Sequence, residues 1–281
     1  MMLRRRNLPP GWYPEDAEGI VKLLSSWVDE RAPGSGAKAA VAPHAGWAFS
    51  GRLAAMAASS LREAETVAVI GGHLPASSAP LAAFEDAFET PLGALQSDAE
   101  LREALAAELS TREGGSLILR GDEVPDNTVE VQLPIVKARF PGSKLLWLRA
   151  PNGRGAIILG EALSRAAAGL GRSVACIGST DLTHYGPAYG FSPAGRGATA
   201  ERWVREQNDK TFIEALLALD PAAALERGEE DQSACSSGAA AAALAFALKE
   251  GATRAELLAY ATSLEVRRDD SFVGYAAVGI Y

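Results

Sequence analysis

Short, continuous apolar runs alternate along the chain with longer stretches in which apolar residues recur at helical spacing. The runs 39–42 and 66–70 stop at Pro43 and at Gly71, and a helical stretch lies between them at 52–63. A strand, a helix and a strand in this order are typical of a β-α-β unit, in which the two strands run parallel. We therefore predict a parallel sheet in the N-terminal part of the chain.

The same alternation continues to the end of the chain, after an amphipathic helix predicted at 16–30. Further helices are predicted at 99–109, 129–139, 155–168, 200–219 and 238–249, and further strands at 117–119, 144–148, 173–178, 257–261 and 272–280. This pattern predicts an α/β fold with a central mixed, mostly parallel β-sheet covered by helices on both faces. No linker interrupts it, so we expect a single domain over residues 11–281 after a flexible N-terminus at 1–10.

Charge and composition argue against several classes of protein. The 35 Asp and Glu residues outnumber the 27 Lys and Arg residues, and the only basic cluster is Arg4, Arg5 and Arg6, so we expect no binding to nucleic acid. No apolar segment follows this cluster as in a secretory signal, and the most apolar stretch, 238–248, is far shorter than the ~20 residues of a membrane span. We expect a cytoplasmic protein with reduced thiols and no membrane partner.

All three histidines of the chain follow predicted strands. His44 comes after the run 39–42, His73 comes after the second strand, and His184 comes after the strand at 173–178. In open α/β sheets, ligand sites form in the loops beyond the carboxyl ends of the strands. Imidazole is the commonest neutral metal ligand, so histidines gathered at this edge predict a shared pocket for zinc, iron or copper.

Cys235 and Asp181 are further candidates for this pocket. Cys235 stands just before the predicted helix at 238–249, whose N-terminal N–H groups favour a thiolate, and a thiolate is a metal ligand or a nucleophile. Cys176 lies inside an apolar run, which favours a packing role. Asp181, three residues before His184, either orients an imidazole or caps its own turn. Glycine spacings typical of phosphate-binding loops are absent, which disfavours nucleotide binding.

Several short motifs occur in a fixed order over nearly the whole chain. They are GWYP from Gly11, PHAGWAFSG from Pro43, GGHLP from Gly71, TPLGAL from Thr90, VEVQLP from Val129, STDLTHYG from Ser179, Cys235 before its helix of small residues, and FVGYAAV from Phe272. As an ordered set they resemble the Memo family, also called AmmeMemoRadiSam system protein B. That family is related in fold to the class III extradiol dioxygenases of the protocatechuate dioxygenase B-subunit type.

The resemblance implies one metal ion held by His44, His73 and Cys235. In the related extradiol dioxygenases, two histidines and a carboxylate hold Fe(II) and leave positions open for substrate and oxygen. Here a cysteine replaces the carboxylate, which makes the site softer and favours copper or zinc more than a carboxylate would. Fe(II) is the expected ion, with copper and zinc as alternatives, and dioxygenase activity cannot simply be transferred.

The resemblance also implies which residues surround the ion. His184 and Asp181 are the catalytic candidates, and Asn127, Trp47 and Tyr185 are expected around the pocket. The family pattern before VEVQLP is usually Glu-His-Ser, whereas this chain carries Asp-Asn-Thr. Because Asn127 cannot titrate near neutral pH, a proton-transfer role at that position is lost. His184 is then the one uncommitted imidazole for acid or base catalysis.

Three functions are compatible with these residues and motifs. The first is a metal-dependent redox or oxygen-using enzyme that acts on a small molecule or a modified residue. The second is a non-catalytic module that holds a peptide or partner in an inherited pocket, as the association of animal relatives with signalling receptors suggests. Zinc-assisted hydrolysis is a weaker third. The name of the bacterial members implies a radical-SAM protein and an AMMECR-type protein as partners.

Overall fold

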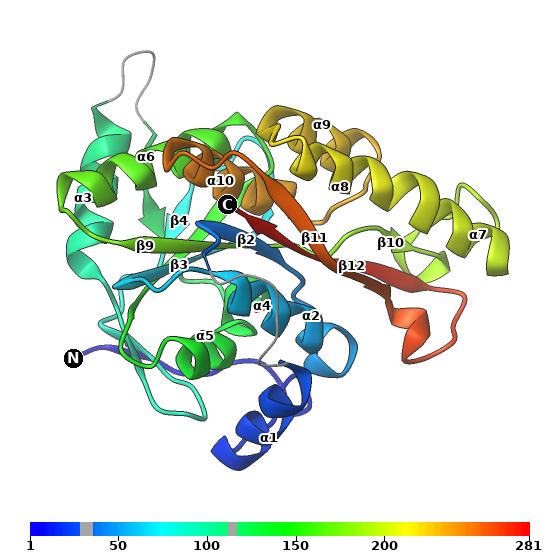
Figure 1. Ribbon diagram of the computed structural model, residues 1–281, viewed down its shortest axis with the longest axis horizontal. Helices are drawn as coiled ribbons and strands as arrows, with labels where there is room; N and C mark the ends of the chain where they lie inside the picture. Colours follow the sequence, from blue (N-terminus) through cyan, green and yellow to red (C-terminus); the bar gives the residue numbers. More distant parts are fainter. Residues whose placement is uncertain (29–35, 112–116) are drawn as a thin grey trace.

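The structure, a computed structural model, describes residues 1–28, 36–111 and 117–281. A mixed β-sheet runs through its centre (Figure 1). Its parallel part consists, in spatial order, of β2 (Ala39–Ala42), β9 (Val174–Ser179), β3 (Thr66–Leu74) and β8 (Lys144–Pro151). Apart from a few end residues these strands are buried, because both faces of the sheet are covered.

Further strands extend the sheet on both sides. Next to β2 lies the antiparallel β12 (Phe272–Ile280), which pairs with both β11 (Ala255–Thr262) and β10 (His184–Tyr185). Beyond β8 lie β4 (Leu81–Ala82) and β7 (Arg120–Gly121). The predicted α/β fold with a central mixed, mostly parallel sheet is confirmed.

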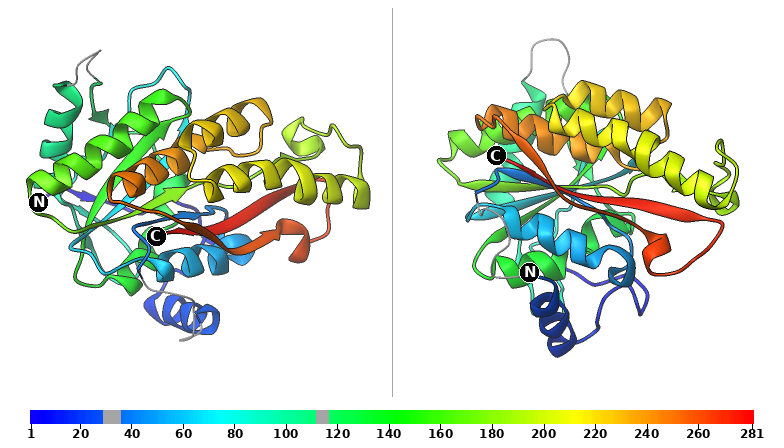
Figure 2. Two further views of the ribbon diagram at one scale, coloured as in Figure 1. Left: turned by 45° about the horizontal axis from the view of Figure 1, so that its top comes forward. Right: turned by 45° about the vertical axis from the view of Figure 1, so that its right-hand side comes forward.

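Helices cover both faces of the sheet (Figure 2). Each face has its own apolar core. One face carries α3 (Ala99–Ser110), α6 (Arg154–Gly169), α8 (Asp209–Leu217), α9 (Pro221–Glu230) and α10 (Ser237–Lys249). The other carries α1 (Ala17–Trp27), α2 (Trp47–Ser60), α4 (Asn127–Glu130) and α5 (Leu133–Arg139). Within the described part of the chain, no helix combines the length and the apolar character that a membrane crossing requires.

Small residues allow α6 and α10 to pack very closely. The first eleven residues of α10 are buried, and most are alanines. A Cβ atom on Gly160 of α6 would overlap the backbone carbonyl of Ala242 in α10. The alanine-rich helix is therefore a packed internal element, and its N-terminus is held at the carboxyl ends of the strands.

Two predicted helices are interrupted. The stretch 129–139 forms α4 and α5, because Pro134 has no N–H to continue the hydrogen-bond ladder from α4. The stretch 200–219 contains α7 (Gly197–Trp203) and α8, joined by a π-helical turn at Val204–Asn208. Such turns insert one extra residue per turn and are frequent at functional sites.

Other boundaries also differ from the prediction. Residues 117–119 do not form a strand; Leu117 and Leu119 pack beside the α6 core, and the strand begins at Arg120. The helix α9 and the short strands were not predicted, since their sequences carry too few periodic positions. The last two residues of the helix predicted at 16–30 lie outside the described residues.

The N-terminal segment lies against the domain, although we expected a flexible end at residues 1–10. Within it, β1 (Leu3–Arg4) pairs with β5 (Ala87–Phe88), which pairs with β6 (Leu95–Gln96). The Arg4 guanidinium also lies over the Trp147 ring, 4.6 Å from its centroid. Arg4 thus has buried partners, which no local pattern of the sequence indicates, whereas Arg5 is exposed as expected.

Candidate metal centre

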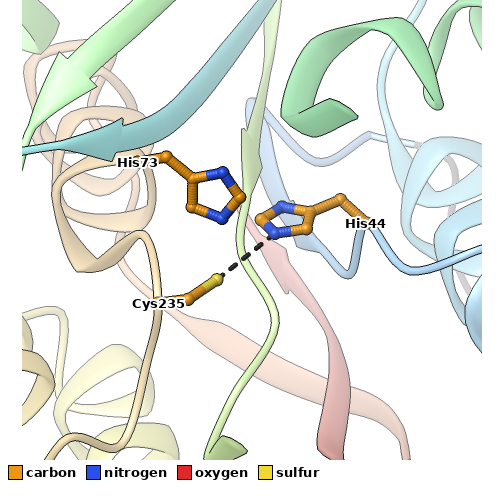
Figure 3. Close-up of side chains that lie close together, drawn as sticks. All are labelled: His44, His73 and Cys235. Carbon is orange, nitrogen blue, oxygen red and sulfur yellow. Dashed lines mark hydrogen bonds between the residues drawn. The ribbon is translucent and has the colours of Figure 1, made fainter. Parts of the chain in front are cut away.

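Three segments that are far apart in the sequence meet at the carboxyl ends of the central strands. His44 follows β2, His73 lies in the last part of β3, and Cys235 comes just before α10. Their side chains lie close together (Figure 3). One nitrogen of each histidine and the cysteine sulfur all lie within 4.8 Å of one another. The structure thus brings the three predicted metal ligands together.

His44 is almost fully buried, and contacts fix its ring and its backbone. Its Nε2 atom lies 3.2 Å from Sγ of Cys235, and its Nδ1 atom lies 3.3 Å from Oγ of Ser179. Its backbone N–H donates to Oδ1 of Asp181 over 2.7 Å. Because Ser179 occupies Nδ1, the Nε2 atom is the nitrogen that faces the centre.

His73 has a left-handed backbone, with a φ angle of 58°, which residues with a side chain rarely adopt. Its Nδ1 atom lies 3.0 Å from Oδ2 of Asp126, so Nε2 remains for the centre. The rings of His73 and His44 meet edge to face, with their centroids 5.1 Å apart. A strained backbone persists only where its surroundings hold it, and such strain gathers at functional sites.

The two histidines make the thiol of Cys235 acidic. Burial raises the pKa of this thiol, but the charge of His44 and the hydrogen bonds from both imidazoles lower it by more, so the pKa lies well below its ordinary value. The sequence predicts a thiolate here from the helix N-terminus. The imidazoles are its direct partners.

The same contacts raise the pKa of both imidazoles. Burial alone would lower the pKa of His73, but hydrogen bonds to Asp126 and Cys235 raise it to about 10. Burial also lowers the pKa of His44, and the negative charges of Cys235 and Asp181 raise it by more. The thiolate of Cys235 and a protonated His73 ring therefore stabilise each other, and a metal ion that binds would displace the His73 proton.

His184 lies beside this group and is paired with Asp181. The Nε2 atom of His184 stands 3.9 Å from Oδ2 of Asp181, and the same oxygen stands 4.0 Å from Nε2 of His44. Burial lowers the pKa of His184, but the hydrogen bond to Asp181 and the charge of Cys235 raise it. Of the two roles considered for Asp181, orientation of imidazoles fits these contacts.

An open cavity of about 430 Å³ leads to the centre. Its lining is polar at His44, His73, Asn127, Asp181 and His184, and aromatic at Trp12, Phe49, Tyr189 and Tyr275. Tyr189, in a short 3-10 turn at Pro187–Tyr189, packs against the His184 ring with centroids 4.9 Å apart and the ring planes tilted by 31°. The cavity thus combines aromatic walls with a proton-carrying ring, as a binding site for a small organic ligand requires.

A smaller cavity, of about 310 Å³, reaches the cysteine. It is lined by Cys235 and Leu182 and shares His184 and Tyr189 with the larger one. Cys235 therefore borders a different cavity from the one that the two ligand histidines line.

The structure brings Asn127 to the cavity but places Trp47 and Tyr185 elsewhere. The Nδ2 group of Asn127 donates to the backbone carbonyl of His44 over 3.1 Å. The Trp47 ring packs on Trp27 and Tyr13, and its Nε1–H donates to the carbonyl of Val131. Tyr185 is also buried, and its hydroxyl donates to the carbonyl of Gly195. Successive residues of a strand point to opposite faces, so Tyr185 turns away where His184 turns in.

Several residues that support the centre were not found from the sequence. Asp209, at the end of the π-helical turn, accepts hydrogen bonds from the N–H and hydroxyl of Thr183 and, over 2.6 Å, from the hydroxyl of Tyr260. Asn208 donates to Oγ of Thr183 over 2.9 Å. These contacts fix the loop that carries His184. The π-helical turn directs the side chains of Asn208 and Asp209 toward this loop. A search for the 3.6-residue period of an α-helix does not reveal such a turn.

The donor set fits a metal ion. Donor atoms of a tetrahedral ion bound at about 2.0–2.3 Å stand roughly 3.3–3.8 Å apart. Here the three donor atoms lie within 4.8 Å of one another, and Nε2 of His44 is 3.2 Å from Sγ of Cys235. Each ring presents one nitrogen, because Ser179 and Asp126 take the other. Metal-binding histidines usually have such partners on their second nitrogen. His44, His73 and Cys235 are therefore a group that could hold an ion.

Comparison with known proteins gives matches over nearly the whole chain. The family model described as Memo-like protein matches residues 4–279. A MEMO1 family protein of Methanosarcina barkeri is 34% identical over 247 residues, which cover 85% of this chain and 84% of the relative. One from Pyrococcus furiosus is 30% identical over 99% of this chain and 98% of its own. One from Methanopyrus kandleri is 33% identical over 98% of this chain and 89% of its own.

Proposed function

The chain belongs to the Memo-like family, and on that premise we propose that it is a metal-dependent oxidoreductase acting on a small molecule or a modified residue. The observation that carries the proposal is the convergence of His44, His73 and Cys235 on one point beside an open cavity. A protein that only needed a stable fold would have no reason to place two imidazoles, that of His44 buried, against a thiol. A domain of this size does not require a metal to fold.

Fe(II) is the proposed ion, with copper and zinc as alternatives. Two imidazoles and one thiolate form a borderline-soft donor set that all three metals accept. When bound, the ion supplies Lewis acidity and, if it is iron or copper, electron transfer. The protein orients the ligands by the hydrogen bonds to Asp126 and Ser179, which prevent the rings from turning.

His184 is the proposed acid–base residue. It lines the cavity next to the three ligands, and Asp181 holds a charge beside its Nε2 atom. A proton on Nε2 can pass to a ligand in the cavity, and Asp181 stabilises the protonated form of the His184 ring. The contact with the Tyr189 ring limits rotation of the His184 ring.

The open cavity suits a ligand that is partly apolar. Aromatic side chains would hold a flat or apolar part of the ligand while the polar lining meets its reacting groups. Two unpaired cysteines suit a reducing compartment such as the cytoplasm. A radical-SAM protein and an AMMECR-type protein remain proposed partners from the family resemblance.

A module that binds a peptide or partner without turnover is the second candidate. The observation that favours it is Asn127, whose amide is engaged with the His44 carbonyl at a position where the family usually carries a histidine. A site that has lost one proton-carrying group keeps its shape and can still bind. Zinc-assisted hydrolysis is a third candidate, for which His184 would serve as the base.

Anaerobic reconstitution tests the enzyme hypothesis. Protein purified without a histidine tag is loaded with Fe(II), its metal content is measured by elemental analysis, and oxygen uptake is followed with catechols and thiols. We expect one ion per chain, loss of the ion in Cys235→Ser, and an ion but no turnover in His184→Ala. No metal uptake would end the proposal, and uptake with equal turnover in His184→Ala would refute the acid–base role.

A further inference from the structure

Arg149 is a buried cation beside the candidate metal centre. It lies in β8, and its residue is 4% exposed. Its Nε–H donates to the backbone carbonyl of Gly72 over 2.9 Å. One terminal nitrogen reaches Oδ1 of Asp122 at 3.2 Å, and the other reaches Oδ2 of Asp126 at 3.3 Å. A single guanidinium thus joins two carboxylates and one carbonyl.

The first carboxylate anchors this cation in the sheet. Asp122 also accepts a hydrogen bond from Nε1 of Trp147 over 2.7 Å, and Arg4 contacts it from the N-terminal segment. Burying a charge is unfavourable unless partners and hydrogen bonds surround it. Here all three guanidinium nitrogens of Arg149 donate hydrogen bonds. The position of Arg149 is therefore fixed from the side away from the centre.

The other two contacts lead to the same residue, His73. Gly72, whose carbonyl Arg149 holds, precedes His73 in the chain. Asp126, whose Oδ2 atom Arg149 binds, holds Nδ1 of the His73 ring with that same oxygen. Arg149 therefore acts on both the backbone and the ring of a residue whose φ angle of 58° is strained.

From these contacts we propose that Arg149 is a positioning residue for the metal centre, which directs Nε2 of His73 at the ion by fixing the Gly72 carbonyl and the Asp126 carboxylate together. The inference rests on the proposed function, since it concerns affinity for the same ion. It identifies Arg149, which is not itself a ligand, as a residue that affects how tightly the three ligands bind the ion. Removing Asp126 or Arg149 leaves all three ligands in the chain but frees the ring of His73 to turn.

Lysine in place of arginine separates positioning from charge. It keeps the positive charge, but a single ammonium cannot reach two carboxylates and a carbonyl with the geometry of a planar fork. Arg102→Lys is the matched control, because Arg102 is another buried arginine, at 8% exposure, which donates to the Ala83 carbonyl away from the centre. Thermal unfolding of each metal-free variant shows whether it folds.

Co(II) titration in competition with a chelator measures the effect. We expect Arg149→Lys to bind Co(II) 10–100-fold more weakly than the wild type and to change the d–d absorption bands, whereas Arg102→Lys keeps both the affinity and the spectrum. Equal affinity and an unchanged spectrum in folded Arg149→Lys would overturn the inference alone. No Co(II) binding by the wild type would overturn the inference together with the proposed metal site.

Asp126→Asn keeps the test decisive if Arg149→Lys does not fold. This change preserves the size of the side chain but weakens its bonds to both Arg149 and His73. The same loss of Co(II) affinity is expected. Wild-type affinity in Asp126→Asn would show that the contact through which Arg149 acts is dispensable, and the inference would fail.

Discussion

The Sγ atom of Cys235 lies 3.2 Å from Nε2 of His44, although 191 positions separate the two residues. The contact exists only when the end of β2 and the start of α10 meet at one edge of the sheet. Folding therefore creates the acidic thiol, and an unfolded chain has two ordinary ones. This difference can be measured by thiol chemistry.

Alkylation by iodoacetamide at neutral pH should modify Cys235 quickly and Cys176 hardly at all in the folded protein. Cys235 borders a cavity, and its thiol pKa is lowered, whereas Cys176 is fully buried in β9 and burial raises the pKa of its thiol. Mass spectrometry of peptides from native and denatured protein gives the alkylation rate of each cysteine in both states. Cys235→Ser should abolish the fast reaction, and Cys176→Ala should leave it unchanged. Equal alkylation rates at the two cysteines in the folded protein would contradict an acidic Cys235 beside His44.

Removing one ligand should weaken metal binding strongly. We expect His73→Ala and Cys235→Ser each to lower the affinity for Zn(II) by about 100-fold or more, because each ligand supplies a share of a large binding free energy. Competition with a chromogenic chelator measures it. His184→Ala is the control, since this ring is paired with Asp181, and we expect it to keep the wild-type affinity within a few-fold. A loss in His184→Ala as large as in His73→Ala would mean that the ligand set is wrong.

Asp209 should make the protein less stable as pH rises from about 4 to 6. Burial raises the pKa of this carboxyl to about 6, despite the hydrogen bonds from Thr183 and Tyr260 that lower it, while in the unfolded chain the pKa is near 3.8. Between these values the folded state holds the proton and the unfolded state does not. The free energy of unfolding therefore falls with rising pH, by roughly 3 kcal/mol at most.

Asp209→Asn should remove this contribution. Urea unfolding at several pH values, with the exposed Glu229→Gln on α9 as control, gives the difference between the variants. Asparagine keeps the shape and stays neutral, so the curve of the variant should lack the fall between pH 4 and 6. Parallel curves for wild type and Asp209→Asn would show that the carboxyl titrates normally.

Glu130 should hold the N-terminal segment, which leads to Trp12 in the cavity wall. Its Oε1 atom accepts hydrogen bonds from the backbone N–H groups of Asn7 and Leu8, 2.9 Å each, and from the hydroxyl of Tyr13. Glu130→Ala leaves these donors unpaired, at about 1–3 kcal/mol. Trypsin should then cleave after Arg6 several-fold faster, as followed by mass spectrometry. Glu18→Ala, at an exposed position of α1, should not change the rate.

Much of the site could be predicted because its ligands stand next to strong local signals. His44 and His73 follow continuous apolar runs that end at Pro43 and at glycines, and Cys235 precedes a helix of small residues. These patterns place all three at one edge of a parallel sheet. The placement of Trp47 away from the cavity could not be predicted, since it depends on the packing of α2 against α1.

The supporting contacts carry no local signal. Arg149 and Asp126 belong to different elements, and their pairing with His73 depends on how β3 and β8 stand side by side. The π-helical turn before Asp209 likewise follows from tertiary contacts and has no sequence period of its own. Arg4 looked like solvated charge because its buried partners, Asp122 and Trp147, lie more than a hundred positions away. Sequence patterns thus locate ligands better than they locate what holds the ligands.

Gly160→Ala should destabilise the protein and weaken its metal site together. The new Cβ would overlap the Ala242 carbonyl and crowd the backbone at Phe246, so α10 must shift. We expect a loss of about 2–3 kcal/mol, or roughly 5–10 °C in melting temperature. Since α10 begins next to Cys235, its displacement should also lower the affinity for Zn(II).

Gly169→Ala is the matched control, because Gly169 is the exposed last residue of α6, the helix that also carries Gly160. A Cβ there meets no atom within 4 Å, and helix propensity favours alanine by up to about 1 kcal/mol. Calorimetry should show an unchanged or higher melting temperature for this variant, and chelator competition an unchanged affinity. If Gly160→Ala matched Gly169→Ala in both stability and Zn(II) affinity, the close packing of α6 on α10 would not be what fixes the cysteine. A Gly160→Ala variant that is equally stable but binds Zn(II) more weakly would instead show that α10 can slide without unfolding.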